Sequence, residues 1–334
     1  MRFWYHGWVV FSRKPHVTEV LHEEIAKWTT RLSHGKMAYF YCMKNLLITG
    51  AGGNIGYEVI RGLHETGSPH RIIAAGHHIG RTREALTGFL SLEFKALDFA
   101  DPGTFKAALK EIDTVFLLRP PQLAEVSRYF EPFIDAMLER EIKEIVFLSV
   151  QGVEKQKRIP HHKIEKLILD KGLDHAFLRP SYFMQNMTTT LIHEIRTASK
   201  IFIPAGTLKF TWVDARDIGL AGAHILNDFG KYRNRAYEIT GTEEKDFEEV
   251  AVLLSQVTGR RISYESPNLI KFFRAKRKLG IPNKMVFVMI MLHFLPRFSK
   301  KTHGITDVVK SITGKTPGTL KAFMEREKNQ FKPM

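Results

Sequence analysis

The sequence comprises 334 residues, of which 44% are hydrophobic, so it can bury the core of one large α/β domain with a smaller lobe. Its net charge is +15, and its single cysteine, Cys42, excludes an intramolecular disulfide framework and indicates a reducing compartment, which we expect to be the cytoplasm. No apolar run reaches the roughly 20 residues of a membrane-spanning helix, and the longest candidate covers only residues 285–292, so we expect no transmembrane segment.

Residues 1–42 differ in composition from the rest of the chain. They hold three of the four tryptophans, yet no helix or strand periodicity runs through them. Their apolar stretch over residues 8–11 is too short for the core of a signal peptide, and three glutamates do not suit a transit peptide. We therefore predict an N-terminal extension outside the fold, which ends before Met43.

The stretch from residue 46 to residue 66 combines a strand, a glycine turn and a helix. Residues 46–48 are an apolar run typical of a buried strand, and the apolar pattern of residues 54–66 predicts a helix. Glycines between them allow a tight turn and a close approach of the backbone to a pyrophosphate, which sits on free N–H groups at the helix N-terminus. The sequence therefore predicts a dinucleotide-binding loop. Its expected cofactor contacts are Gly50, Ala51, Gly53, Asn54, Ile55 and Gly56.

From residue 44 strand and helix patterns alternate, which is typical of a parallel sheet with helices on both faces. We predict five further strands, a loop over residues 76–81, a polar helix from Thr82 and a helix start at Asp101. The predicted strands cover residues 71–75, 94–97, 114–118, 144–149 and 176–178. Residues 43–182 are thus predicted to form a Rossmann-like, doubly wound domain. Strands from later in the chain can be added to its sheet. Ligands of such sheets bind beyond the carboxyl ends of the strands, so we expect the strand tips to face one crevice.

After residue 182 the pattern changes to short strands and helices, and we assign residues 183–334 to a smaller α+β substrate lobe. Its predicted elements cover residues 211–213, 215–226, 236–240 and 247–257.

The positive charge is concentrated near the C-terminus. From Leu269 onward the chain contains fifteen lysines and arginines but only three acidic residues, so twelve of the fifteen net positive charges lie there. Such a patch suits nucleic acid or an acidic membrane surface. No nucleic-acid-binding signature accompanies it, so we expect basic C-terminal helices with a solvated face and no nucleic acid partner. Residues 285–295 are expected to pack in the core, with insertion into a membrane interface as the alternative.

The end of the second strand bears on the choice of cofactor. A carboxylate there selects NAD through the ribose diol, whereas a nearby arginine accommodates the 2′-phosphate of NADP. This chain offers His77, His78, Arg81 and Arg83, and no carboxylate. NADP(H) is therefore favoured over NAD(H), with Arg81 or His78 as the expected phosphate contact. A surface position at a helix start is the alternative for Arg81.

Further candidates lie after the third and fifth strands. Asp98 can accept a hydrogen bond from the adenine amino group with Phe99 packed beside it, or it can cap a helix. The spacing of Thr49, Gly50, Gly53 and Gly56 resembles that of the extended and atypical short-chain dehydrogenase/reductase superfamily. Those enzymes often have a catalytic serine where Ser149 lies, although a turn serine is an alternative. They usually pair a tyrosine with a lysine four residues later, and none of the nine tyrosines here has one, so the usual proton donor is absent.

Three residues that open the helix after the fifth strand are chemical candidates. His161, His162 or Lys163 can donate a proton or lie against the nicotinamide ribose, and a surface role is the alternative. Adjacent residues diverge by about 100° on a helix, and no nearby cysteine or aspartate completes a ligand set, so we expect no metal. The catalytic group stays unassigned among Ser149, His161, His162 and Lys163.

Six segments together resemble the NmrA-like family, an atypical branch of the short-chain reductases. They are TGAGGNIG (49–56), LLRPP (117–121), FLSVQG (147–152), PHHK (160–163), LRPSYFMQN (178–186) and VDARDI (213–218). The resemblance covers nearly all of the chain after residue 42 and implies a Rossmann domain with a small C-terminal domain. It also implies NAD(P)H-dependent reduction of quinones, azo dyes or triphenylmethane dyes, or dinucleotide binding without turnover in a redox sensor. The absent tyrosine–lysine pair agrees with it, whereas the His77-His78 ending of the second strand departs from it.

The resemblance also assigns residues around the nicotinamide. It places Leu118, Arg119 and Pro120 beside the nicotinamide, although Arg119 can instead pair with a helix carboxylate. It implies closure over the cofactor by Ser149, Val150 and Pro180. It implies an aromatic, mostly apolar acceptor pocket, with packing between domains as the alternative. The substrate-binding residues assigned to this pocket are Tyr182, Phe183, Gln185 and Asn186.

We therefore expect an NAD(P)H-dependent oxidoreductase that passes hydride to a conjugated small-molecule acceptor. The alternative is a non-catalytic NADP(H) sensor that acts through a protein partner, and homo-oligomers fit either expectation.

Overall fold

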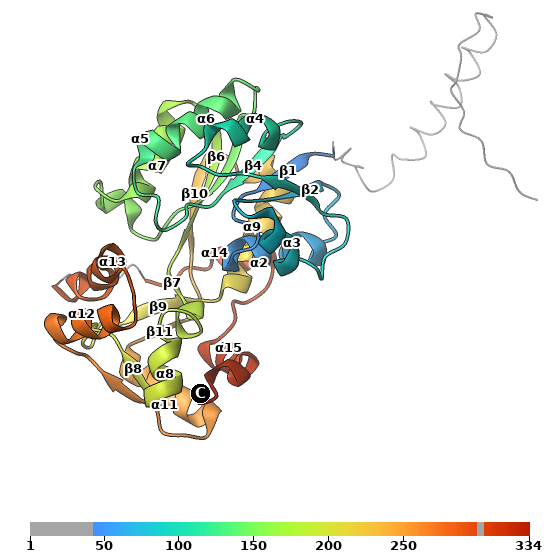
Figure 1. The fold of residues 1–334 in the computed structure, drawn as a ribbon. Helices are drawn as coiled ribbons and strands as arrows, with labels where there is room; N and C mark the ends of the chain where they lie inside the picture. Colours follow the sequence, from blue (N-terminus) through green and yellow to red (C-terminus); the bar gives the residue numbers. More distant parts are fainter. Residues whose placement is uncertain (1–42, 299–303) are drawn as a thin grey trace, which may run out of the picture. The chain divides into compact units, whose positions relative to one another are not determined.

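The computed structural model describes residues 43–298 and 304–334, and the extension predicted over residues 1–42 lies outside these residues. Residues 43–334 group into one compact unit. A seven-stranded sheet, in which every pair of neighbouring strands is parallel, forms its centre (Figure 1). In spatial order the strands are β10 (Arg235–Ile239), β6 (Asp174–Pro180), β5 (Glu144–Leu148), β4 (Thr114–Leu117), β1 (Asn45–Ile48), β2 (Arg71–Gly76) and β3 (Glu93–Ala96).

Helices cover both faces of this sheet because successive strand residues point to opposite sides. In β1, Leu46 and Ile48 join one buried cluster, whereas Leu47 joins another. The first face carries α2 (Asn54–Glu65), α3 (Ile79–Ala85), α9 (Ala215–Asn227), α10 (Phe229–Tyr232) and α14 (Val308–Thr313). The second face carries α4 (Phe105–Ala108), α5 (Val126–Tyr129), α6 (Glu131–Leu138) and α7 (Pro160–Asp170). The predicted Rossmann-like α/β fold is confirmed.

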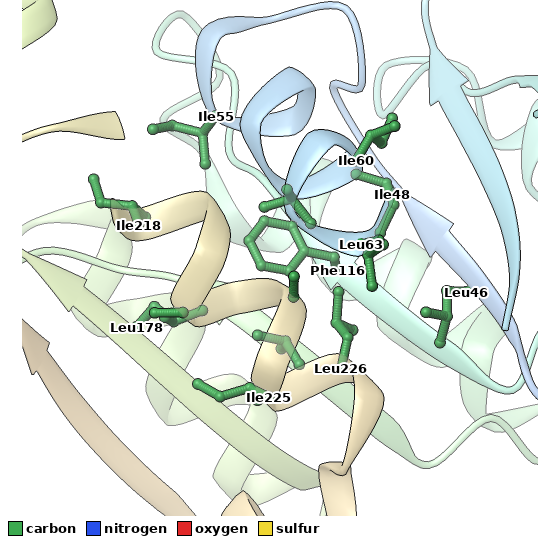
Figure 2. Packing of buried hydrophobic residues seen from close by; sticks show 14 of the residues in the cluster. Leu46, Ile48, Ile55, Ile60, Leu63, Phe116, Leu178, Ile218, Ile225 and Leu226 are labelled. Atoms are coloured by element: carbon green, nitrogen blue, oxygen red, sulfur yellow. The ribbon is translucent and has the colours of Figure 1, made fainter. Parts of the chain in front are cut away.

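Helices α2 and α9 pack closely against each other over the sheet. Figure 2 shows Phe116 of β4 among side chains of these two helices, with Leu226 of α9 beside it. A Cβ atom at Gly219 of α9 would lie 2.3 Å from the backbone carbon of Glu58 in α2, so only glycine permits this approach. Helix α2, which the glycine turn precedes, is therefore held in place by a helix about 160 residues further along the chain.

Two predicted elements differ from the observed ones. The loop predicted over residues 76–81 is too long, because α3 begins at Ile79 and not at Thr82. The carbonyl oxygen of His78 accepts hydrogen bonds from the backbone N–H and the hydroxyl of Thr82, which closes the first helical turn early. The sixth strand is longer than predicted, because β6 extends from Asp174 to Pro180.

The remaining elements pack around a third buried cluster, which contains Trp212 and Phe247. Its strands form two small sheets, β11 (Glu243–Lys245), β9 (Phe210–Val213) and β7 (Tyr182–Phe183), and β12 (Ser263–Glu265) with β8 (Lys200–Phe202). Its helices are α8 (Ile192–Ala198), α11 (Phe247–Thr258), α12 (Leu269–Lys278), α13 (Asn283–His293) and α15 (Leu320–Arg326). Single 3₁₀ turns are η1 (Pro102–Thr104), η2 (Val153–Lys155), η3 (Met184–Met187), η4 (Leu295–Phe298) and η5 (Lys328–Phe331). Within the described residues, no helix is both long enough and apolar enough to cross a membrane.

The domain boundary predicted between residues 182 and 183 stays a prediction. Helix α9, strand β10 and helix α14 come after that boundary in the chain but pack with the seven-stranded sheet. The lobe therefore consists of the elements around the third cluster, and the chain passes back to the sheet before it completes the lobe.

Candidate functional site

The glycine turn lies at the carboxyl end of β1, and two glycines determine its shape. Gly50 has a φ of +57°, a left-handed conformation that a residue without Cβ adopts at no steric cost. A Cβ atom at Gly56 would lie 2.4 Å from the carbonyl oxygen of Gly50. The N–H of Gly53 donates to that same oxygen over 2.9 Å and closes the turn. Strand, turn and helix thus succeed one another in the compact form that the sequence predicts.

Helix α2 begins without a side-chain cap. Gly53 is its N-cap residue, no side chain of the described residues caps the first turn, and that turn contains no acidic residue. The first N–H groups of a helix have no intrahelical partner and lie at the positive end of the helix dipole. The amides of Asn54 and Ile55 are consequently placed to bind an anion. This arrangement fits the pyrophosphate of a nicotinamide dinucleotide.

Several polar side chains lie near the end of β2 and on α3, beside this turn. Nε2 of His77 lies 3.1 Å from a carboxylate oxygen of Asp98, and the ring centroids of His77 and His78 are 4.1 Å apart. Arg83 lies over the ring of Phe94, 4.4 Å from its centroid. Arg81 is exposed on α3 and has no hydrogen bond or ion pair with any described residue. Arg83 is thus held against an aromatic ring, whereas Arg81 has no such contact with a described residue, and the contact of Arg81 with a 2′-phosphate stays a prediction.

The two residues predicted to contact adenine have different surroundings. Asp98 accepts a hydrogen bond from the N–H of Ala100 over 2.9 Å, beside its contact with His77. The ring of Phe99 is buried against Phe130 and Phe133, with both centroid distances 5.1 Å. Phe99 belongs to the core of the second face, and its contact with adenine stays a prediction.

The segment after β4 is braced by Arg119. Its Nη1 donates to the carbonyl oxygens of Pro120, Pro121 and Leu123, each over 3.0 Å. Arg119 Nη1 therefore bonds to carbonyl groups, and no helix carboxylate among the described residues pairs with this arginine, contrary to the alternative prediction. The neighbouring N–H of Leu118 donates to the hydroxyl of Thr49 over 2.8 Å, which ties this segment to the glycine turn.

His161 is the most strongly perturbed of the three candidates on α7. Nε of Arg119 donates to Nε2 of His161 over 3.4 Å, so the imidazole carries its own proton on Nδ1. Burial and the charge of Arg119 lower the pKa of His161 to about 3, so it is neutral at physiological pH. His162 contacts the carbonyl oxygen of Val153 over 3.2 Å, and Lys163 is exposed. A charged imidazole at His161 is therefore not available as a proton donor.

Ser149 is a buried residue with an unused hydroxyl at the carboxyl edge of the sheet. Its N–H donates to the carbonyl oxygen of Leu178 over 2.7 Å, but Oγ has no hydrogen-bond partner in the described chain. Val150 is the next residue, and the N–H of Gln151 donates to the carbonyl oxygen of Pro180 over 3.0 Å. Buried hydroxyls rarely lack a hydrogen-bond partner, so the hydroxyl of Ser149 is suited to bond with a polar group of a bound ligand.

Arg179, whose strand tip was expected to face the same crevice, is occupied elsewhere. Its guanidinium donates to both carboxylate oxygens of Glu165 over 3.0 and 2.7 Å. It is therefore a structural residue between β6 and α7.

Among the predicted acceptor residues, Tyr182 is bonded to a histidine that the sequence did not single out. Its hydroxyl lies 2.8 Å from Nε2 of His293 in α13, and Nδ1 of His293 lies 2.6 Å from the carbonyl oxygen of Met289. Nδ1 therefore carries the proton, and Tyr182 donates to Nε2. Burial lowers the pKa of His293 to about 4 and raises the pKa of Tyr182 above its usual range. This tyrosine is a poor proton donor to an acceptor.

Gln185 connects the lobe to helix α9. Its amide nitrogen donates to Asp214 over 2.7 Å, and its amide oxygen accepts from the N–H of Ala215 over 3.0 Å. Phe183 packs against the cluster on the first face of the sheet, and Asn186 lies in η3. Of the four predicted acceptor residues, Gln185 is thus the one that faces the glycine turn.

An open cavity of about 300 Å³ lies between the glycine turn and the lobe. Gly53 and Asn54 line one side, and Gln185 and Arg326 line the other. Arg326 of α15 donates to the buried carboxylate of Asp214 over 2.7 Å, and this contact lowers the pKa of Asp214 against the opposing effect of burial. Sequence reasoning missed Arg326 because it lies 112 residues from its partner and no local motif marks it.

Comparison with known proteins agrees with this geometry. A family model described as the NmrA-like family matches residues 43–315. Prestalk A differentiation protein A of Dictyostelium discoideum is 29% identical over 84% of this chain and 91% of its own length. The NAD(P)H azoreductase of Xenophilus azovorans is 27% identical over 86% and 99% of the two chains. Among solved structures, the triphenylmethane reductase of a Citrobacter species superimposes with a TM-score of 0.73 at 18% identity, over 85% of this chain and 99% of the other.

Proposed function

This chain belongs to the NmrA-like family, whose members similar to it include NAD(P)H oxidoreductases, and we propose that it transfers hydride from NADPH to a quinone, a dye or a similar conjugated acceptor. The observation that carries the proposal is the uncapped helix N-terminus behind the glycine turn, in a chain similar to azo-dye and quinone reductases. The single cysteine supports a reducing compartment such as the cytoplasm.

Several residues are proposed to hold the cofactor. The amides of Asn54 and Ile55 bind the pyrophosphate, and the guanidinium of Arg81 binds the 2′-phosphate. A bound NADPH supplies the hydride. The hydroxyl of Ser149 is satisfied by a polar group of the nicotinamide half, and the loop braced by Arg119 excludes water from one side.

The chemistry of the acceptor is inferred from the absence of the tyrosine–lysine pair and of a charged histidine among the two most strongly perturbed histidines. No tyrosine precedes a lysine by four residues, and both His161 and His293 are neutral because burial lowers their pKa values. Carbonyl reduction needs a positioned acid, whereas a quinone or dye becomes a stabilised anion that water protonates after hydride transfer. The site therefore suits flat conjugated acceptors.

The proposal is tested by oxidation of NADPH in the presence of quinones, azo dyes and nitroaromatic compounds. We expect acceptor-dependent turnover, which Gly56→Ala reduces together with NADPH affinity by about tenfold or more, because the new methyl group displaces the turn. Gly80→Ala is the matched control, since a Cβ atom there meets no atom within 4 Å. Tight NADPH binding without turnover of any acceptor would refute the reductase.

That outcome would favour the alternative, a sensor that binds NADP(H) and acts through a protein partner. The relative from Dictyostelium discoideum, which is named for cell differentiation and not for a reaction, supports this alternative. Calorimetry distinguishes the two, because a sensor binds the oxidised and reduced cofactors with different affinity and its partner binding changes accordingly.

A further inference from the structure

The apolar run predicted to pack in the core is largely exposed in the structure. Helix α13 buries Val286, Met289 and His293 on one side. The opposite side and the adjoining turn η4 expose large apolar side chains. These are Phe287 (57% exposed), Val288 (47%), Met291 (54%), Leu292 (57%), Leu295 (48%) and Phe298 (74%). The prediction of core packing was therefore wrong for half of this helix.

These exposed residues form one continuous stripe. Residues three, four, seven and eight apart lie on the same side of a helix, and Lys284 begins this series one turn before Phe287. We call the apolar residues of this series, 287, 288, 291, 292 and 295, the α13 stripe. Exposed apolar residues scattered singly are ordinary, but a stripe of this length marks a surface that binds something.

The charge around the stripe identifies its partner. Residues 269–306 contain nine lysines and arginines and no acidic residue. Helix α12 packs against α13 through Phe273 and Phe287, whose ring centroids are 5.6 Å apart, and Figure 1 shows the two helices side by side. On α12, Lys271, Arg274 and Lys278 line one open groove. Lys271 pairs with Glu265 of β12, whereas Arg274 and Lys278 have no acidic partner among the described residues. An apolar stripe beside such a predominantly basic surface suits a partner that is both apolar and anionic.

A second copy of the chain and the N-terminal residues 1–42 are two other possible partners of the stripe, and the charge of both suits this basic surface poorly. A second copy of the chain would bring the same basic surface against itself. Residues 1–42 carry six basic and three acidic residues, so they too are net positive. We propose that the α13 stripe and the basic side chains of α12 dock the protein on an anionic lipid bilayer, with the stripe inserted among the acyl chains and the lysines and arginines at the headgroups.

The test is sedimentation of the full chain with phosphatidylcholine vesicles that contain or lack phosphatidylserine. We expect binding only to the anionic vesicles and a loss of binding at high salt. Lys278→Gln with Lys284→Gln should weaken binding roughly 25-fold, at about fivefold for each charge. Phe287→Gln with Met291→Gln and Leu295→Gln should weaken it about tenfold or more, because the apolar anchor is lost.

Leu90→Gln with Leu169→Gln is the matched control, since both residues are exposed apolar residues on the Rossmann domain. Unchanged NADPH affinity shows that each variant is folded. Failure of the wild type to bind anionic vesicles overturns the proposal, as does a stripe variant that binds as well as the wild type. A wild-type dimer that the stripe variant converts into a monomer, with no vesicle binding by either, assigns the stripe to a second copy and also overturns it.

Discussion

At the scale of single residues, the proposed preference for NADPH depends on Arg81, which pairs with no described residue. The sequence left His78 and Arg81 as candidates, and the structure separates them from Arg83, which lies on Phe94. Arg81→Ala should weaken NADPH binding about tenfold and leave NADH binding unchanged, because a charge-assisted hydrogen bond to the 2′-phosphate is lost. Arg83→Ala is the matched control, and titration calorimetry measures both. Equal losses for NADPH and NADH would show that Arg81 does not contact the 2′-phosphate.

Two histidines with lowered pKa values, the partly buried His161 and the buried His293, give the fold a pH dependence. The pKa values of His161 and His293 are lowered from 6.5 to about 3 and about 4, so the unfolded chain binds protons at a higher pH than the folded chain does. Their contribution to stability is complete above pH 6.5 and is lost as the pH falls toward 4. Asp217 opposes this change, because burial raises its pKa to about 6 and the folded chain keeps that proton longer.

We therefore predict how the difference in unfolding free energy between the wild type and His293→Gln changes with pH. Both proteins contain Asp217, so its contribution cancels in this difference. His293→Gln should be less stable than the wild type at neutral pH because the bond to Tyr182 is weakened. This difference in unfolding free energy should decrease by about 1.4 kcal/mol per pH unit below pH 6.5, since only the wild type loses the contribution of its neutral His293. Urea unfolding at several pH values measures it, with exposed His193→Gln as control. A gap that is constant with pH would contradict a neutral, buried His293.

At the scale of elements, local signals explain which parts of the fold were predictable. Strand β1, the glycine turn and α2 were predicted because each has its own apolar pattern or turn residue. The place of β10 in the large sheet was not visible, since only its pairing with β6, about 60 residues earlier, determines it. The exposure of α13 was missed because the helix is apolar on every side, so periodicity could not show which side is buried.

The contact between α2 and α9 supports the site through Gly219, a glycine that no sequence motif marked. Gly219→Ala should destabilise the protein by about 1–3 kcal/mol, because its methyl group overlaps the backbone of Glu58 and pushes the helices apart. NADPH affinity should fall with it, since α2 carries the glycine turn. Gly230→Ala, where a Cβ atom meets no atom within 4 Å, is the control, and thermal unfolding measures both. Equal stability of the two variants would show that α9 adjusts without cost.

At the scale of the whole molecule, the proposed membrane surface and the proposed acceptor site share one helix. The exposed side of α13 carries the stripe, and its buried side carries His293, which accepts the hydrogen bond from Tyr182. The stripe and the Tyr182–His293 hydrogen bond therefore lie on opposite sides of one helix. If both proposals hold, we expect the enzyme to accept a quinone with a long apolar tail.

This link predicts a difference between two acceptors. With anionic vesicles present, Phe287→Gln with Met291→Gln and Leu295→Gln should raise KM for a long-tailed quinone held in the vesicles about tenfold, because the enzyme no longer docks beside it. Turnover of a short-chain, water-soluble quinone should be unchanged, since the stripe is exposed and contacts no cofactor residue. If neither quinone is reduced by the wild type, the reductase proposal fails. If the variant loses both activities equally, or neither, the acceptor does not enter from the bilayer, because docking then has no separate effect on the membrane substrate.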